Sequence, residues 1–249
     1  MLVLLPPSET KRPGGEGPPV SFDDLALPVL APQRSAVADA LVALAADADL
    51  AARVLKLSAA RRHEIDDNAA LRTSGTMPAV ERYTGVLYDA LSAGDLDGAS
   101  REWLGRHALI HSAPFGPVGG LDGIPAYRLA AGTSVPGLGS LRAVWSTAVT
   151  TALAAERRGF VLDLRSEAYA ALGPLPAAAP SAYVRVVSEG PDGVARALNH
   201  FNKRAKGELV RSLATDRPDV ESAEDLVAWA SSAGWSMRLD AAGELQLTV

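Results

Sequence analysis

Apolar positions along this chain follow two spacings, and each spacing predicts a different kind of element. Short apolar runs bounded by prolines or charged residues predict buried strands, at residues 2–5 (LVLL) and 160–164 (FVLDL). Longer stretches with apolar residues three and four positions apart predict amphipathic helices. The expected helix starts are Ser35, Asp49, Ser58, Ser100, Ser140, Asn199 and Ser222.

Strand pairs and loops complete the pattern. The predicted hairpins pair residues 183–187 with 194–198 and residues 235–239 with 244–249. Gly190-Pro191-Asp192-Gly193 forms the turn of the first hairpin. Residues 12–34 and 112–139 are rich in proline and glycine and predict irregular loops. Strands and helices are thus mixed along the chain, and 249 residues suit one large domain or two small ones.

Composition excludes several classes of site. The chain has no cysteine, which excludes disulfides, zinc–cysteine sites, iron–sulfur clusters and thiol nucleophiles. Its net charge is −5, so binding to nucleic acid requires a local basic patch. Apolar runs are all far shorter than a membrane span, and residues 2–5 are too short for a signal-peptide core. We therefore expect no membrane association and a cytoplasmic location.

Two polar clusters follow the two apolar strands. Ser8, Glu9, Thr10 and Lys11 come directly after the first strand, and residues 165–169 (RSEAY) come after the second. Ligands in α/β proteins are held at such strand ends. If the two strands are neighbours, the clusters meet and form one polar cleft from distant parts of the chain. An ordinary turn after each strand is the alternative.

Further candidates lie on the helices and loops between these strands. Tyr83-Thr84-Gly85 places two hydroxyls beside bare backbone, and Tyr83 shares a predicted helical face with Leu87 and Leu91. Tyr127-Arg128 pairs an aromatic ring with a guanidinium, which suits contact with an anion or a base. Ordinary packing and a buried structural arginine are the alternatives.

Metal and phosphate motifs are weak. His107 and His111 are four residues apart on the helix predicted from Ser100 to Ser112, but no third ligand is evident, so we expect no metal site. The glycines between residues 116 and 123 match neither the P-loop nor the dinucleotide-binding fingerprint. We expect no cofactor.

The helix from Asn199 has a basic first half. Its cations are Lys203, Arg204, Lys206 and Arg211. Lysines near a helix start oppose the helix dipole, which favours anions there. Such a cluster is better suited to holding an external anion than to stabilising the helix. A solvated helix face is the alternative.

Taken in order, these segments resemble the peroxide-stress YaaA family over nearly the whole length. The resemblance rests on MLVLLPPSETK, Tyr83-Thr84-Gly85, Tyr127-Arg128-Leu129, Trp145, residues 164–169 (LRSEAY), residues 202–207 (NKRAKG) and Gly243-Glu244-Leu245. It implies a cytosolic protein that limits hydrogen peroxide damage and is associated with lower free intracellular iron. It also implies a mixed α/β fold, one compact domain over residues 1–249, with a sheet flanked by helices and a positively lined cleft.

The resemblance also implies binding of double-stranded DNA through a helix-hairpin-helix-like element. We assign that element to the glycine-rich turn at residues 115–123, whose backbone amides would contact phosphates. Many relatives carry a lysine where this chain has Glu9, and the turn lacks an arginine that relatives carry. Both differences lower the local positive charge.

Two functional hypotheses follow. The leading one is a stress-protective protein that binds double-stranded DNA non-specifically, with phosphate contacts from Lys203, Arg204, Lys206 and Arg211. The other is an enzyme acting on a nucleotide, nucleobase or other small anion, with Glu9 or Glu167 as general acid or base. The remaining members of the expected cleft are Ser8, Thr10, Lys11, Tyr83, Thr84, Arg128, Ser166 and Lys203.

Overall fold

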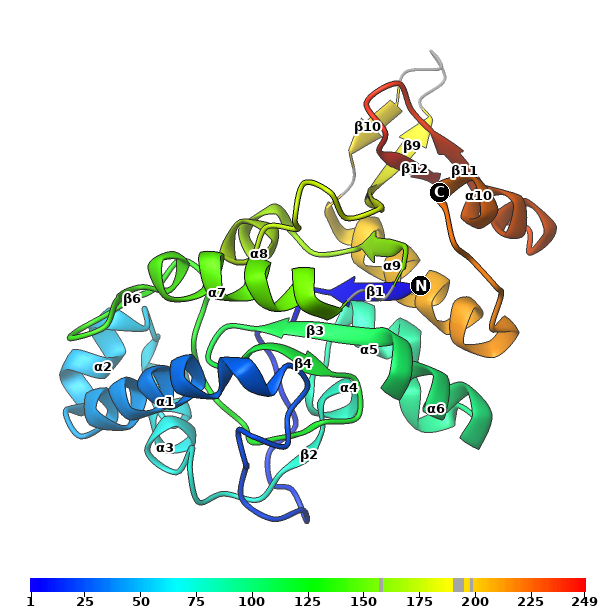
Figure 1. The fold of residues 1–249 in the computed structure, drawn as a ribbon. Helices are drawn as coiled ribbons and strands as arrows, with labels where there is room; N and C mark the ends of the chain where they lie inside the picture. The colour runs from blue at the N-terminus through cyan, green and yellow to red at the C-terminus, as the bar shows by residue number, and fades with distance from the viewer. Residues whose placement is uncertain (157–158, 190–194, 198) are drawn as a thin grey trace.

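The fold is built on one mixed sheet. A computed structural model describes residues 1–156, 159–189, 195–197 and 199–249 (Figure 1). The strands of the sheet lie in the order β11-β12-β9-β8-β1-β3-β4, and β10 pairs beside β9. Their bounds are β1 Leu2–Leu5, β3 Ala108–Ser112, β4 Gly116–Gly119, β8 Val161–Asp163, β9 Ser181–Glu189, β10 Ala195–Ala197, β11 Ser236–Leu239 and β12 Leu245–Thr248.

The centre of the sheet is parallel. Strand β1 pairs in parallel with β3 on one side and with β8 on the other, and β8 continues in parallel to β9. Antiparallel partners extend the sheet through the β3–β4, β9–β10 and β11–β12 pairs. All four residues of β1 are buried. A central parallel strand is covered on both faces, which explains why its sequence is a continuous apolar run.

Helices flank both faces of this sheet (Figure 1). Their bounds are α1 Ala31–Ala45, α2 Ala48–Val54, α3 Glu64–Ala69, α4 Ala79–Arg82, α5 Val86–Leu91, α6 Gly98–His107, α7 Leu141–Glu156, α8 Glu167–Leu172, α9 Asn199–Asp216 and α10 Ala223–Ser232. Short 3₁₀ helices span Pro28–Leu30, Ala59–Arg61 and Ala93–Asp95. Small two-stranded pairs join β2 (Met77–Pro78) to β5 (Gly123–Ile124) and β6 (Ser134–Val135) to β7 (Gly139–Ser140).

Helix α9 packs unusually close to α5, and a glycine makes this possible. A Cβ added at Gly207 would lie 2.1 Å from the carbonyl oxygen of Leu87 and 2.9 Å from Cβ of Ala90. Any larger residue would push the two helices apart. Helix α9 also contacts strand β9 of the sheet.

Most predicted elements are confirmed. The strands at residues 2–5 and 160–164, the helices from Ser140 and Ser222, and the C-terminal hairpin occur as predicted. Strands β9 and β10 form the other predicted hairpin, although its turn at residues 190–194 lies outside the described residues. One contiguous core joins these elements, so the chain is a single compact mixed α/β domain as predicted.

Several helix starts were predicted wrongly. Helix α1 begins at Ala31, because Pro32 suits the first turn of a helix, and Ser35 lies inside it. Helix α2 is capped by Asp47, not Asp49, and α6 is capped by Asp97, not Ser100. In both cases the carboxylate of the earlier residue accepts the orphan backbone N–H groups of the first turn.

The helix predicted through Ser112 ends at His107, and the rest of that stretch is strand β3. His107 and His111 therefore do not share a helical face. The glycine-rich segment assigned to a helix-hairpin-helix element contains β4 and a turn, and residues 115–120 are all buried. Its backbone amides are not presented to DNA phosphates, so that placement was wrong. Within the described residues, the structure has no helix long and apolar enough to span a membrane.

Candidate functional site at the carboxyl edge of the sheet

Several of the polar residues that the sequence singled out lie at the carboxyl ends of β1, β3 and β8, a place that we call the carboxyl-edge site. The chain places β3 on one side of β1 and β8 on the other, so the strand order reverses at β1. In parallel α/β sheets this reversal opens a place for ligands outside the carboxyl ends of the strands. The loop Ser8–Lys11 follows β1 directly and lies at this position.

This loop is fixed by a short antiparallel pairing with residues 82–84. The backbone N–H of Arg12 donates to the carbonyl of Arg82 at 2.8 Å, and that of Thr84 donates to the carbonyl of Thr10 at 3.1 Å. The Thr10 hydroxyl also donates to the Thr84 carbonyl and lies 3.3 Å from Ser8 Oγ. The predicted segments 8–11 and 83–85 therefore do lie side by side, with the Ser8 and Thr10 hydroxyls at the rim and the Tyr83 hydroxyl buried.

Lys11 turns inward beneath this loop. Its Nζ donates to the carbonyl oxygens of Ser8 and Glu9, at 3.2 Å each, and lies 4.0 Å from the centre of the Tyr127 ring. Burial, and then the nearby Arg128 guanidinium, lower the pKa of Lys11 to about 7. At neutral pH this side chain is therefore divided between ammonium and free amine.

Arg128 is held in place from behind and is incompletely paired in front. The Asn68 side chain accepts the Arg128 backbone N–H at 2.8 Å and donates to its carbonyl at 2.9 Å. Arg128 Nη1 donates to Glu9 at 3.0 Å, whereas its Nε lies 3.6 Å from Glu64. The Nε is buried and has no hydrogen-bond acceptor among the described residues. The Glu64 carboxylate therefore faces this Nε from just beyond hydrogen-bonding distance.

Carboxylates surround these cations. Glu64 pairs with Arg61 at 2.6 Å, and Arg61 reaches Glu9 at 3.9 Å. The hydrogen bond from Arg128 lowers the pKa of Glu9, so Glu9 is a carboxylate at neutral pH and suits a base or an acceptor. Burial, and then the charge of Glu64, raise the pKa of Asp67.

Three buried hydroxyls form the floor of this site. The Tyr83 and Tyr127 hydroxyls lie 2.8 Å apart, and Ser112 Oγ at the end of β3 donates to Tyr127 at 3.1 Å. Burial raises the pKa of both phenols well above their usual value, so they stay neutral. The ring faces of the same two tyrosines lie beside Lys11 Nζ, at 5.6 Å for Tyr83 and 4.0 Å for Tyr127.

The cluster after β8 forms a hydrogen-bonded network around Arg165. Burial, then the charges of Tyr127 and Glu9, raise the pKa of Tyr169 at the end of this cluster, so the two polar clusters do meet there. Arg165 makes two hydrogen bonds to Asp163, from Nε at 2.9 Å and from Nη2 at 2.7 Å. Its Nη1 donates to the Gly173 carbonyl at 2.8 Å and to His111 Nδ1 at 3.1 Å. Burial, and then Arg165, hold the pKa of His111 well below its usual value, so the ring is neutral and accepts. This network fastens the strand ends together.

Ser166 and Glu167 do not share the surroundings of Glu9. Both residues are exposed, and Glu167 pairs with Arg185 at 3.3 Å. Arg185 also pairs with Glu244 of the C-terminal hairpin. The structure therefore does not bring Glu9 and Glu167 into one site, and it leaves a single carboxylate of the predicted pair beside Arg128.

The basic residues of α9 do not form a common face. Lys206 is 5% exposed, and its Nζ donates to the Leu164 carbonyl at 3.0 Å. Arg211 donates to the carbonyls at the end of α5, Leu91 and Ser92, at 2.9 Å each. Lys203 and Arg204 are exposed, and Arg204 pairs with Glu208 at 2.7 Å. Only two of the four predicted phosphate contacts thus face solvent.

Sequence reasoning missed five residues of the site: Arg61, Glu64, Asp67, Asn68 and Ser112. The first four of them lie in or next to α3, in the helical stretch predicted from Ser58. The signal that would have found them is Asn68, a polar residue among the apolar positions of that helix. Within the described part of the chain, no group of three or more histidines and carboxylates is arranged to hold a metal ion.

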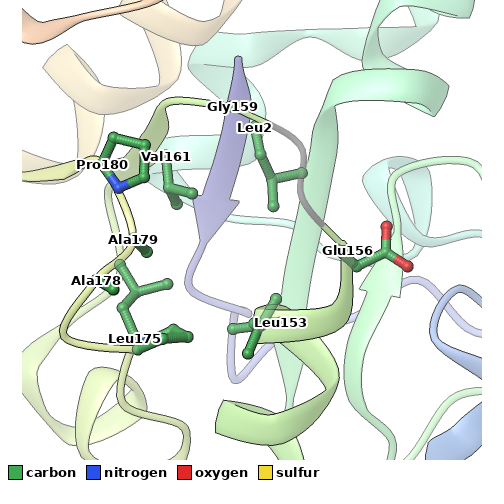
Figure 2. A pocket seen from close by; sticks show the side chains of 11 residues that line it. Leu2, Leu153, Glu156, Gly159, Val161, Leu175, Ala178, Ala179 and Pro180 are labelled. Carbon is green, nitrogen blue, oxygen red and sulfur yellow. The ribbon is translucent and has the colours of Figure 1, made fainter.

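The amino edge of the same sheet has the opposite character. A hollow of about 270 Å³ lies at the starts of β1 and β8, where Figure 2 shows mostly carbon side chains around it. Its lining includes Leu2, Leu153, Val161, Leu175 and Pro180. Apart from Glu156, the residues that line this hollow are apolar or glycine, whereas charged side chains surround Arg128 at the carboxyl edge.

Comparison with known proteins gives a consistent result. The family described as peroxide stress protein YaaA matches residues 1–241. A UPF0246 protein of Corynebacterium glutamicum is 43% identical over 94% of this chain and 93% of its own length. UPF0246 proteins of Corynebacterium efficiens and Streptomyces coelicolor are 43% and 42% identical, over 100% and 97% of this chain and 99% and 93% of their own lengths.

Proposed function

Because the chain belongs to the peroxide stress protein YaaA family, we propose that it serves the peroxide response by binding an anionic nucleotide group at the carboxyl-edge site. The observation that carries this proposal is Arg128, whose side chain is 9% exposed and whose Nε has no acceptor among the described residues. A phosphate or carboxylate oxygen would supply that acceptor. The cytosolic role that the family resemblance implies suits such a ligand.

The other groups of the site favour a nucleotide over a simple inorganic anion. Ser8 and Thr10 place hydroxyls on the rim, where they suit sugar or phosphate oxygens. Glu9 is a carboxylate and its side chain is 65% exposed, so it would repel phosphate but accept an N–H or O–H donor. A ligand with both an anionic end and a donor end, such as a nucleotide, satisfies both charges.

Glu9 is also the general base that this site offers, because it is ionised and lies beside the guanidinium that would hold the ligand. Glu167 has no such position. Of the two carboxylates predicted as general acid or base, only Glu9 thus lies beside Arg128, and catalysis by Glu9 would consist of proton removal from a ligand held by Arg128.

Double-stranded DNA is the second candidate partner, and the exposed pair Lys203 and Arg204 at the start of α9 favours it. Two phosphate contacts give weak binding with a modest salt dependence. The phosphate groups that the protein binds would then belong to a DNA strand and not to a free nucleotide.

One experiment separates these sources. Binding of a nucleoside monophosphate and of a labelled duplex is measured over a salt series for the wild type, Arg128→Met and Lys203→Ala/Arg204→Ala. Loss of nucleotide binding in Arg128→Met, with the double variant unaffected, supports the carboxyl-edge site. Duplex binding that weakens only in the double variant supports DNA on α9. Nucleotide binding that is absent, or unchanged by Arg128→Met, refutes the proposed site.

A further inference from the structure

The two edges of the main sheet differ in how they are covered. At one edge, all four residues of β4 are buried. At the other edge, three of the four residues of β11 are exposed, and no described element pairs with the outer side of this strand. Leu239, at the end of β11, is 39% exposed and is one of three large apolar side chains exposed in the described residues. An uncovered strand edge of this kind can pair with a strand of another chain.

The backbone of β11 presents free hydrogen-bonding groups along this edge. The N–H of Asp240 donates to the Glu244 carbonyl at 2.9 Å, at the turn end of the ladder between β11 and β12. Residues of an antiparallel strand direct their N–H and C=O groups alternately toward the neighbouring strand and away from it. Arg238 therefore bonds to β12, whereas Met237 and Leu239 direct these groups outward. Strand β11 also contains neither proline nor lysine, which protect such edges in many proteins.

Two opposite charges lie on either side of Leu239 in the sequence and share the other face of the strand. Arg238 Nε donates to Gln246 Oε1 at 3.0 Å, and the guanidinium has no ion pair within the described part of the chain. The backbone hydrogen bond from Glu244 lowers the pKa of Asp240, so this carboxyl is ionised at neutral pH. It likewise has no ion pair among the described residues. The strand end thus carries a cation and an anion that both lack an ionic partner.

We propose that β11 is a dimerisation edge, at which the β11 strand of a second copy of this chain pairs in antiparallel orientation about a two-fold axis at Leu239. This inference does not depend on the proposed function. In this register Arg238 lies directly opposite Asp240 of the second copy, and the symmetric pair forms on the other side of the axis. The two Leu239 side chains meet on the opposite face of the sheet, and their outward N–H and C=O groups exchange two hydrogen bonds.

Charge selects this register and this partner. An axis at Arg238 would place two guanidinium groups opposite each other, which is unfavourable. An axis at Met237 would place Arg238 opposite Ser236 and leave its charge unpaired. Only the axis at Leu239 forms two ion pairs, so the strand is complementary to a second copy of itself. Such self-complementarity is the condition for a two-fold interface between identical chains.

The first test measures self-association. Sedimentation velocity of the whole protein from about 1 µM to about 1 mM covers the affinities of small interfaces, and we expect a monomer–dimer equilibrium in this range. Leu239→Pro removes the outward N–H but spares the bonds to β12, so it should abolish the dimer without changing the circular dichroism spectrum. The matched variant Leu239→Thr keeps this N–H and should still dimerise. A wild type that stays monomeric, or a Leu239→Pro variant that dimerises as well as the wild type, overturns the proposal.

The ion pairs are tested separately. Arg238→Glu converts two attractive cross-strand pairs into two repulsive ones, so we expect the dissociation constant of the dimer to rise about tenfold or more. The control Arg106→Glu changes an exposed arginine of α6 in the same way and should leave this constant unchanged. An unchanged dissociation constant in Arg238→Glu contradicts the pairing of Arg238 with Asp240.

The lack of cysteine in the chain allows the register to be determined directly. A single cysteine is placed at each residue of β11 in turn, and the four variants are oxidised with copper phenanthroline. Leu239→Cys should cross-link most, because Cα atoms of a hydrogen-bonded pair lie about 5.5 Å apart, within reach of a disulfide. Ser236→Cys is also exposed but far from the axis, so it should cross-link least. Equal cross-linking at all four positions, or a maximum at a residue other than 239, refutes the proposed pairing.

Discussion

Two arginines lie at the carboxyl edge of the sheet, and they are used in different ways. Arg165 is 1% exposed, and every one of its nitrogens has a partner in Asp163, Gly173 or His111. Arg128 is nearly as buried, yet its Nε has no acceptor among the described residues. Arg165 is thus fully paired within the fold, whereas Arg128 keeps one donor for which we propose a ligand as the acceptor.

The two inward-facing lysines repeat this contrast. Lys206 donates to the Leu164 carbonyl and lies near Asp163, which belongs to the network around Arg165. Lys11 is held by loop carbonyls and an aromatic face, with carboxylates on one side and Arg128 on the other. Burial lowers the pKa of both, but only Lys11 lies where a ligand would be.

The largest expected loss of stability comes from breaking the hydrogen-bonded network around Arg165. Arg165→Met leaves the buried Asp163 carboxylate without its counter-charge, which should lower the free energy of unfolding by about 3–5 kcal/mol. Urea denaturation measures this change. Asp163→Asn/Arg165→Met removes both charges and should recover part of the loss. A single variant as stable as the wild type would show that the network is not what fastens these strand ends.

Removing the Arg128 guanidinium should lower the affinity for a nucleotide more than it lowers the free energy of unfolding. Arg128→Met removes a charged donor, so we expect nucleotide affinity to fall about 10- to 100-fold. The free energy of unfolding should change less than in Arg165→Met, because Glu9 is largely exposed. Calorimetric titration and urea denaturation provide the two numbers. Equal losses of stability in the two variants would remove the distinction between the arginines.

The exposed and buried cations of α9 should differ in salt dependence. For any duplex binding, Lys203→Ala/Arg204→Ala should lower the slope of log affinity against log salt by about 2, because each phosphate contact contributes about 0.9. Lys206→Ala should leave the slope unchanged, since its Nζ is bound to the Leu164 carbonyl. A smaller slope in Lys206→Ala would mean that α9 rearranges on DNA.

The last prediction concerns pH and compares the two inward-facing lysines. The pKa of Lys11 is about 7 in the folded protein and has its ordinary value of 10.5 in the unfolded chain. Between these values the unfolded chain binds more protons, so the free energy of unfolding rises as pH rises from 7 to 10. Lys11→Met should flatten this rise, and Lys206→Met should flatten its upper part, since that pKa is about 8. Parallel curves for the wild type and Lys11→Met would contradict the lowered pKa.

Much of this architecture could be predicted from local pattern. Residues 2–5 and 160–164 were recognisable as strands because continuous apolar runs are typical of buried parallel strands. Their adjacency placed Ser8–Lys11 near the strand end of β8. Helix α7 and the C-terminal hairpin followed from periodicity in the same way.

The errors have a common physical origin. Residues 108–112 continue the apolar spacing of α6, and only pairing with β1 and β4 makes them a strand. The sequence pattern likewise predicted that Glu9 and Glu167 share one cleft, although Glu9 pairs with Arg128 and Glu167 pairs with Arg185. Lys206 is buried because Gly207 lets α9 approach α5 and the sheet. Each of these outcomes depends on tertiary partners that spacing does not reveal.

Strand β1 has a consequence for the order in which the molecule assembles. Val3 pairs with Ala108 on one side and with Leu162 on the other. Contacts between residues so distant in sequence form slowly, because long loops must close first. The loop carrying Lys11 follows this strand and cannot take its place earlier. Recovery of ligand binding after dilution from denaturant should therefore lag behind helix formation, because it requires β1 to pair with β3 and β8 first.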